Sequence, residues 1–316
     1  MAKMAEKRQP EIYEAEFSKV VDNLLGAEGP VFDKDGNFIM VAPEVMKGDS
    51  YAGQVLTVNL ETKKADVLCE PNVDGYGGIP AGCQCDKDNN IWIADMRLGI
   101  LKVKSDGDYE QVCRVDKNGD KMQGCNDCCF DYDGNLWVTA PAAEIAPAEY
   151  RRSFEAPFGS VYCYTKNKEV IKVATDMWFP NGIAVLHSSD GRPKKLIVAE
   201  TKTKMLWGYD IEGAGKLGPK EEWGKLPNSD GGPDGMDFDQ ENNLLVAHHG
   251  SGHLAVFGPE GGDPQTLIKC PFSKPSNLHF KKNTNTVYVT EHQYHGLWKF
   301  EWKRPGKLQY CDIISL

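Results

Sequence analysis

Four side chains that can bind a metal ion through oxygen stand at equivalent positions of a repeated sequence pattern. Glu28, Asn126, Asn181 and Asp234 each open an apolar run beside Gly or Pro residues. If the repeats are arranged around an axis, equivalent positions converge on that axis. Two carboxylates and two amide oxygens, completed by water, would fill the roughly six to eight oxygen positions that Ca²⁺ takes in proteins. The spacing therefore predicts a calcium site on the axis.

Each of these residues, taken alone, has a plainer interpretation. A polar residue at the opening of a repeat can simply hydrogen-bond to backbone groups in a channel mouth. Four such residues in register favour the metal, because two buried like charges need a counter-charge. Cys and His are absent from these openings, which argues against a soft metal.

The repeat also predicts the elements that must position these side chains. Ala81 and Ser276 open the other two of six segments, so that successive openings are 42 to 55 residues apart. Each segment contains a strongly β-prone run, such as residues 38–41, 91–94 and 136–139. A period of about 40–50 residues with four strands is typical of propeller blades. We therefore predict an all-β fold, a six-bladed β-propeller with four-stranded antiparallel blades around a central metal-containing channel.

The segments follow one another without a linker, which predicts one propeller domain over residues 17–316 after an N-terminal tail over residues 1–16. The run at 17–21 is expected to add a strand to the last blade and so close the ring, which removes the free edges of an open sheet. Residues 141–157 break the rhythm and are expected to form a loop over one face, where substrate contacts commonly lie.

Composition bounds the possible partners and the location. The net charge is −10 and Lys and Arg form no cluster beyond short pairs, which argues against nucleic-acid binding. The first 16 residues are charged and do not resemble a signal peptide, and no apolar run approaches the roughly 20 residues of a membrane helix. Ten cysteines in such a chain suggest a reducing compartment. We expect a cytoplasmic monomer that acts on a small molecule, without nucleic-acid or membrane partners.

Three further groups of residues invite a functional interpretation. Asp237 and His279 would bind a second, structural cation or form a simple hydrogen-bonded pair. His292 follows the last β-prone run and would serve either as a general base near the axis or as a packing residue. A transition-metal site at His248, His249 and His253 has no spacing rule behind it.

Several motifs point away from other chemistries. The pairs Cys83-x-Cys85 and Cys125-x-x-Cys128-Cys129 lack partners at zinc-finger spacing, so that buried free thiols are the better interpretation. The chain has no GxSxG elbow, no P-loop and no HExxH motif. Covalent serine catalysis and nucleotide hydrolysis are therefore disfavoured.

Longer segments of the chain resemble the squid-type diisopropyl fluorophosphatases, closely and over nearly the whole length. The matching segments are residues 26–33, 75–86, 94–99, 122–128, 179–184, 234–239 and 275–280. Matches of this length are far more specific than a turn motif. The gluconolactonase and regucalcin-like lactonases, which are broader relatives, share the propeller and an axial metal but not these long segments.

The resemblance implies two Ca²⁺ ions in the channel of a six-bladed propeller. Its catalytic-calcium ligands fall on the four openings already named, Glu28, Asn126, Asn181 and Asp234. Its structural-calcium ligands fall on Asp237, the Leu278 carbonyl and His279. Two supporting residues match at Asp127 and Asn277, and His292 matches a histidine proposed as the base.

The substrate pocket of the family also maps onto this chain. Its wall residues match at Glu44, Ile79, Met96, Tyr150, Arg152, Phe179 and Thr201. One departure stands out, because this chain has His248-His249 where the family has Asn-Trp. The Trp lines the substrate pocket there, so His249 is expected to change the polarity and shape of the pocket.

The implied activity is hydrolysis of the P–F bond of organophosphorus fluoridates. Calcium would polarise the phosphoryl oxygen. Either Asp234 attacks phosphorus, which the resemblance favours, or a water molecule attacks while Asp234 or Glu28 takes its proton. Two alternatives remain open, a calcium-dependent lactonase and a calcium-binding scaffold propeller without catalysis.

Overall fold

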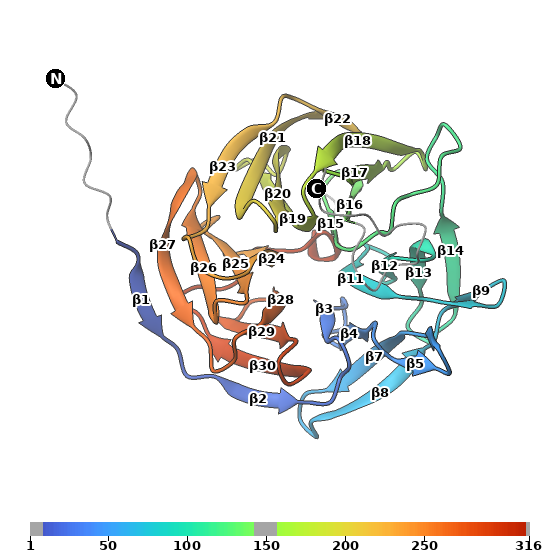
Figure 1. The fold of residues 1–316 in the computed structure, drawn as a ribbon, viewed down its shortest axis with the longest axis horizontal. Helices are drawn as coiled ribbons and strands as arrows, with labels where there is room; N and C mark the ends of the chain where they lie inside the picture. Colours follow the sequence, from blue (N-terminus) through green and yellow to red (C-terminus); the bar gives the residue numbers. More distant parts are fainter. Residues whose placement is uncertain (1–8, 142–156, 314–316) are drawn as a thin grey trace.

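The computed structural model describes residues 9–141 and 157–313, which form thirty strands and one short 3-10 helix, η2 (Tyr310–Asp312). Figure 1 shows the strands arranged as successive sheets around a common centre, with one strand of each repeat innermost. The fold is thus all-β and propeller-like. None of the helices in the described ranges is long and apolar enough to cross a membrane.

Four of the sheets each contain four antiparallel strands. In three of these sheets the strands run outward from the centre in chain order, whereas the outermost strand of the fourth comes from the N-terminal part of the chain. These sheets are β3 (Glu28–Phe32), β4 (Phe38–Ala42), β7 (Gln54–Asn59) and β8 (Lys64–Cys69); β11 (Pro80–Cys85), β12 (Ile91–Asp95), β13 (Gly99–Val103) and β14 (Tyr109–Cys113); β15 (Cys128–Phe130), β16 (Leu136–Ala140), β17 (Gly159–Tyr164) and β18 (Val170–Met177); and β28 (Pro275–Phe280), β29 (Thr286–Glu291), β30 (Gly296–Glu301) and β2 (Ser18–Val21).

The two remaining repeats belong to one ten-stranded sheet rather than to two separate blades. Its first half is β19 (Pro180–His187), β20 (Pro193–Glu200), β21 (Met205–Gly213) and β23 (Glu221–Lys225), and its second half is β24 (Gly232–Phe238), β25 (Leu244–His249), β26 (His253–Gly258) and β27 (Gly261–Lys269). The halves meet where β23 and β27 run parallel, through the single register pair Gly224 and Gly262.

The remaining short strands pair with one another or with strands of these sheets. β22 (Lys216–Leu217) pairs with β21, while β5 (Met46–Lys47) pairs with β6 (Ser50–Tyr51) and β9 (Asn72–Val73) with β10 (Tyr76–Gly77). β1 (Glu11–Glu14) lies in the stretch that we expected to be a tail, yet it pairs in parallel with β27.

The ring closes through its N-terminal strand. β2 pairs antiparallel with β30, with Ser18 opposite Lys299 and Val21 opposite Leu297. The last sheet therefore combines the two ends of the repeat region, and the closing strand expected from residues 17–21 is confirmed.

The core lies between neighbouring sheets. Val31 and Ile39 of the β3–β4 pair pack in one cluster with Cys83 and Ile93 of the β11–β12 pair. Because each sheet is sandwiched on both faces, the middle of its second strand is largely apolar, and β4 is buried at all five positions. The continuous apolar runs of the sequence are explained by this packing.

Tight turns join the first and second strands. In the first repeat, Asp33 Oδ1 accepts hydrogen bonds from the backbone N–H groups of Asp35 and Asn37, at 2.9 and 2.8 Å. Gly36 takes a left-handed φ of 84°, which a glycine adopts without strain. The same arrangement recurs at Asp131 and Gly134, so that the repeated Asp-x-Asp-Gly-Asn sequence fixes how these hairpins turn.

Candidate functional site

The four oxygen-bearing residues predicted from the repeat line one cavity. Glu28, Asn126, Asn181 and Asp234 come from four different repeats and meet around a space of about 350 Å³. Glu28, Asn181 and Asp234 lie at or near the start of the innermost strands β3, β19 and β24, whereas Asn126 stands just before β15. Because the repeats are arranged in a ring, residues at the same position of each repeat meet at its centre.

A glycine after the opening residue lets neighbouring inner strands approach closely. A Cβ on Gly182 would lie 2.1 Å from the carbonyl oxygen of Asp234, and a Cβ on Gly235 would lie 2.1 Å from the Asn277 side chain. Neither distance leaves room for a side chain. The repeated opening-residue-then-glycine pattern thus brings the polar side chains of adjacent repeats together.

The carboxyl groups in and beside the cavity are buried near one another. Burial raises the pKa of Glu28 to about 8, with a further contribution from the charge of Asp127. Burial likewise raises the pKa of Asp127 to about 7, and burial together with the charges of Glu28 and Asp127 raises that of Asp234 well above its usual range. The ionised forms of these groups therefore require a nearby positive charge.

Amide groups hold these carboxyls in place. The Asn181 side chain hydrogen-bonds to the Asp234 carboxyl and also donates to Thr201 Oγ1 at 3.3 Å. The Asn277 side chain hydrogen-bonds to both Glu28 and Asp127. Asp127 and Asn277, expected to support the site, are therefore in contact with it.

This donor set fits a hard divalent cation. Among residues 9–141 and 157–313, no group of three or more His, Cys, Asp and Glu side chains is placed to hold a metal. The axial set is of another kind, since two of its four members are asparagines. Its donors are all oxygens and its carboxyls need a counter-charge, which are the requirements that Ca²⁺ meets.

The second predicted group forms a buried Asp–His pair. His279 Nδ1 lies 3.6 Å from Asp237 Oδ2, which is too long for a direct hydrogen bond. Asp237 instead accepts from the backbone N–H groups of Phe238 and Phe280, at 2.8 and 3.1 Å, and from Gln309 Nε2 at 3.1 Å. Leu278, whose carbonyl was expected to join them, is buried on β28 beside His279.

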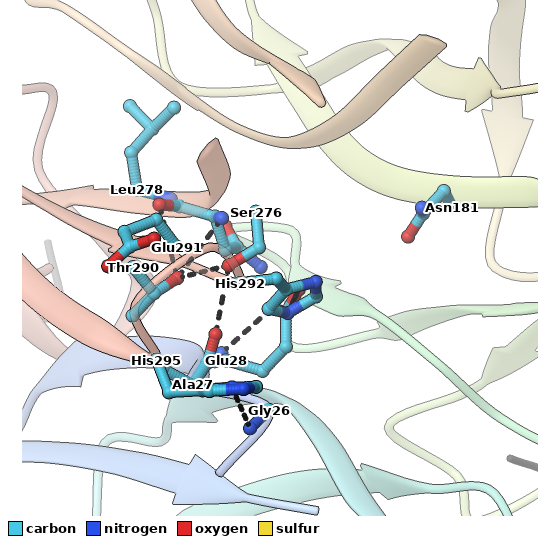
Figure 2. Close-up of polar contacts among 12 residues, drawn as sticks. Gly26, Ala27, Glu28, Asn181, Ser276, Leu278, Thr290, Glu291, His292 and His295 are labelled. Carbon is cyan, nitrogen blue, oxygen red and sulfur yellow. Dashed lines mark hydrogen bonds and ion pairs between the residues drawn. The ribbon is translucent and has the colours of Figure 1, made fainter. Parts of the chain in front are cut away.

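His292 lies against Glu28 in the cavity wall. His292 Nε2 is 3.6 Å from Glu28 Oε1, the contact drawn in Figure 2, and has no hydrogen-bond partner in the part of the chain that the structure describes. Burial, and then the nearby His249, lowers the pKa of His292 to about 3. The ring is therefore neutral near pH 7. It meets the His249 ring edge to face, with centroids 5.4 Å apart.

A hydroxyl group ties the first inner strand to the last. Ser276 Oγ donates to the Ala27 carbonyl at 2.9 Å and lies 2.9 Å from Thr290 Oγ1, as Figure 2 shows. Gly26 N–H donates to His295 Nδ1 at 3.0 Å in the same region. These contacts fix the backbone immediately before Glu28.

Most of the expected pocket walls line the same cavity, namely Glu44, Met96, Phe179, Thr201 and His249, and the candidate base His292 lines it too. Ile79 does not line it but is fully buried behind it, packed with Ala81 and Met96. Tyr150 and Arg152 lie outside the described residues. Lys202 also lines the cavity and was missed by the sequence interpretation, in which its place after Thr201 is the sole hint.

The cysteines are free thiols, as expected. Cys83, Cys85, Cys125, Cys128 and Cys129 are all unpaired and buried. Burial raises the pKa of Cys83 and of Cys125 well above the usual thiol range, so that both stay protonated.

The ring of sheets with polar groups gathered at its axis defines the propeller class. Within that class, the SMP-30/Gluconolactonase/LRE-like region matches residues 26–293. The chain therefore belongs to the SMP-30/gluconolactonase/LRE-like family.

Individual relatives agree with this assignment. The chain is 57% identical over 306 residues to diisopropyl-fluorophosphatase of Loligo vulgaris, a match that covers 96% of this chain and 98% of the squid protein. It is 25% identical to regucalcin of Gallus gallus, over 83% of this chain and 82% of that protein.

A solved structure shares the fold at low identity. The calcium-binding protein regucalcin from Agrobacterium tumefaciens matches with a TM-score of 0.75 at 18% identity, covering 97% of this chain and 100% of that chain. This likeness supports the all-β propeller-like architecture.

Proposed function

We propose that this enzyme is a calcium-dependent phosphotriesterase that hydrolyses the P–F bond of organophosphorus fluoridates such as diisopropyl fluorophosphate. The observation that carries this proposal is the 57% identity, over 96% of the chain, to a hydrolase named diisopropyl-fluorophosphatase. The axial cavity supplies the matching chemistry, since it gathers two carboxyls and two amides beside apolar walls.

The finer architecture is part of the same proposal. We infer six blades, because the ten-stranded sheet consists of two antiparallel four-stranded runs joined at one parallel register pair. We infer one propeller domain over residues 17–316, preceded by a tail over residues 1–16 whose strand β1 lies against β27. The free cysteines suit a reducing cytoplasmic location, and we propose a monomer that acts on a small molecule.

Two calcium sites follow from the donor atoms. Glu28, Asn126, Asn181 and Asp234 would hold a catalytic Ca²⁺, and Asp237, the Leu278 carbonyl and His279 would hold a structural one. When bound, the catalytic ion supplies a Lewis acid for the phosphoryl oxygen and the counter-charge for the buried carboxylates.

Asp234 is our proposed nucleophile. Its carboxyl is held by the Asn181 side chain and by the backbone N–H of Gly235, so that its direction is fixed before substrate arrives. Attack forms an Asp234 oxygen–phosphorus bond while the P–F bond breaks and fluoride leaves with the electron pair. Water then opens the phosphoenzyme. In the alternative route, water attacks phosphorus directly and Asp234 or Glu28 takes its proton.

The walls would position the substrate. We propose that His292, whose low pKa makes it a weak base, acts mainly as a neutral wall group that contacts Glu28. Glu44, Ile79, Met96, Tyr150, Arg152, Phe179 and Thr201 remain proposed pocket residues. His249 makes one wall more polar than the tryptophan of the resembling family would.

A lactonase is the second candidate, favoured by the family match and by relatives named gluconolactonase and lactonase. The two activities are separated by measuring kcat/KM on diisopropyl fluorophosphate and on a panel of aldonolactones with one calcium-loaded preparation. Preference for the fluoridate supports our proposal. Rapid lactone opening without fluoride release would replace it, and a folded, calcium-loaded protein inactive on both would favour a scaffold.

A further inference from the structure

A serine and a histidine outside the axial cavity form a second pair with the elements of a nucleophile and its base. Ser229 Oγ lies 3.3 Å from His248 Nε2. Ser229 is exposed, in the loop between β23 and β24, whereas His248 is 2% exposed near the end of β25. The separation is slightly longer than a tight nucleophile–base hydrogen bond, as is common before a substrate binds.

The histidine lies beside the serine as a weak base in its neutral form. Burial, followed by the charges of His253 and Lys204, lowers the pKa of His248 to about 4, so that the ring is neutral near pH 7. The ring also hydrogen-bonds to the backbone of Asp230, a contact that favours an N–H at that nitrogen. A ring that donates there presents Nε2 as the acceptor for the Ser229 hydroxyl.

A positive charge is fixed at the same loop. Lys204 Nζ donates a hydrogen bond to the Ser229 carbonyl oxygen. The Lys204 carbonyl in turn accepts from the backbone N–H of Leu226, at 2.9 Å, which holds the lysine beside the loop. An ammonium group in this place would stabilise the negative charge that develops on a phosphoryl oxygen during attack by Ser229.

This pair is separate from the proposed axial site. His249 lines the axial cavity, but His248 and Ser229 do not. Successive side chains of a strand point to opposite faces, which explains why adjacent histidines of β25 serve different surroundings. The three-histidine metal site considered from the sequence is not needed to account for His248.

We propose that Ser229, activated by His248, is a covalent modification site for phosphofluoridates. The Ser229 Oγ–phosphorus bond forms as the P–F bond breaks, and fluoride leaves with the bonding electron pair. The hydroxyl proton passes to His248 Nε2 and from there to water. The product is a dialkylphosphoryl-serine, formed once per molecule and independently of turnover in the axial cavity.

Mass spectrometry tests this proposal. The full chain and its Asp234→Asn variant are incubated with excess diisopropyl fluorophosphate, and the intact mass and the peptide that carries the adduct are determined over time. We expect one diisopropylphosphoryl group, on Ser229, in both proteins. An unlabelled Ser229 in both would overturn the proposal. The experiment measures an adduct on Ser229 and not turnover in the axial cavity. Its result therefore tests this proposal even if the axial cavity does not hydrolyse the fluoridate.

Matched variants identify the role of each residue. Ser229→Ala should abolish the adduct, and His248→Gln should slow its formation by about 10²-fold, the usual contribution of a positioned base. Ser188 is the control, because it is a partly exposed serine whose hydroxyl donates to Asp190 rather than to a histidine. Ser188→Ala should leave labelling unchanged. Equal labelling rates at Ser188 and Ser229, or a folded His248→Gln protein labelled at the original rate, would contradict the dyad.

Discussion

Gly182 and Asp234 are in such close contact that a Cβ on the glycine would lie 2.1 Å from the aspartate carbonyl oxygen. The contact joins the inner strands β19 and β24, which carry Asn181 and Asp234 into the same cavity. The relative placement of these two side chains therefore depends on a residue that has no side chain.

Gly182→Ala should push the two strands apart. We expect a loss of about 1–3 kcal/mol in the free energy of unfolding, which is typical of overpacking, together with a large loss of activity. Urea denaturation and fluoride release measure the two effects. Gly213→Ala is the matched control, since Gly213 lies in a strand with open space around its Cβ position. Equal behaviour of the two variants would show that the close approach is unimportant.

Asp234 should become labelled during a single turnover in ¹⁸O water. If its carboxylate attacks phosphorus and water opens the phosphoenzyme at the carboxyl carbon, one heavy oxygen enters Asp234. Peptide mass analysis detects it, and the Glu28 peptide serves as the unlabelled control. Heavy oxygen found in the phosphate product alone would rule out opening at the carboxyl carbon and leave either opening at phosphorus or direct attack by water. Under either route, Asp234→Asn should lower kcat by roughly 10³–10⁴-fold.

Asp95 should make stability depend on pH. Burial raises its pKa from 3.8 to about 6, while its Oδ1 accepts the N–H groups of Arg97 and Leu98 at 2.8 and 2.7 Å. Because the folded-state pKa is the higher one, the stabilisation is present below pH 3.8 and is lost as the pH rises through about 6. Asp95→Asn keeps the acceptor oxygen and removes the titration.

Denaturation between pH 4 and pH 7 tests this sign. Relative to Asp95→Asn, the wild-type free energy of unfolding should fall by up to about 3 kcal/mol across this range. A constant difference between the two proteins would show that Asp95 ionises normally in the folded state.

His249→Trp should improve hydrolysis of diisopropyl fluorophosphate. The substitution replaces a neutral imidazole in the cavity wall with a larger apolar ring, which is expected to contact the isopropyl groups of the substrate. A gain of about 1 kcal/mol in apolar contact corresponds to about fivefold in kcat/KM. His253→Gln, at the start of β26 and outside the cavity lining, is the control. Unchanged kinetics of a folded His249→Trp protein would show that this wall does not select the substrate.

The sequence allowed the axial residues to be predicted because their signal is periodic. Asn181 and Asp234 occupy the same position in repeats that fold alike, so that register alone brings them together. Lys202 could not be found in this way, because it lies in the turn after β20 and not at one of the opening positions of the repeat. The pocket walls come from such turns and loops, whose lengths differ among the repeats.

The repeat pattern also could not predict the long-range contacts between outer strands. The ten-stranded sheet exists because β23 meets β27 at the single pair of Gly224 and Gly262, for which periodicity gives no signal. Likewise, the charged composition of residues 1–16 suggested a tail, but Tyr13 of β1 packs edge to face on Trp302 with ring centroids 5.6 Å apart. This aromatic contact, the four residues paired with β27 and the ion pair between Lys303 and Glu11 hold that strand in place.

The most direct test of the account is fluoride release from diisopropyl fluorophosphate, followed with a fluoride electrode. The protein is assayed with calcium, after strong chelation, and after calcium is restored, with folding checked by circular dichroism at each stage. We expect catalytic release with calcium, its loss on chelation and its recovery on readdition. Undiminished release from thoroughly chelated protein, or no release from folded, calcium-loaded protein, would contradict a calcium-dependent phosphotriesterase.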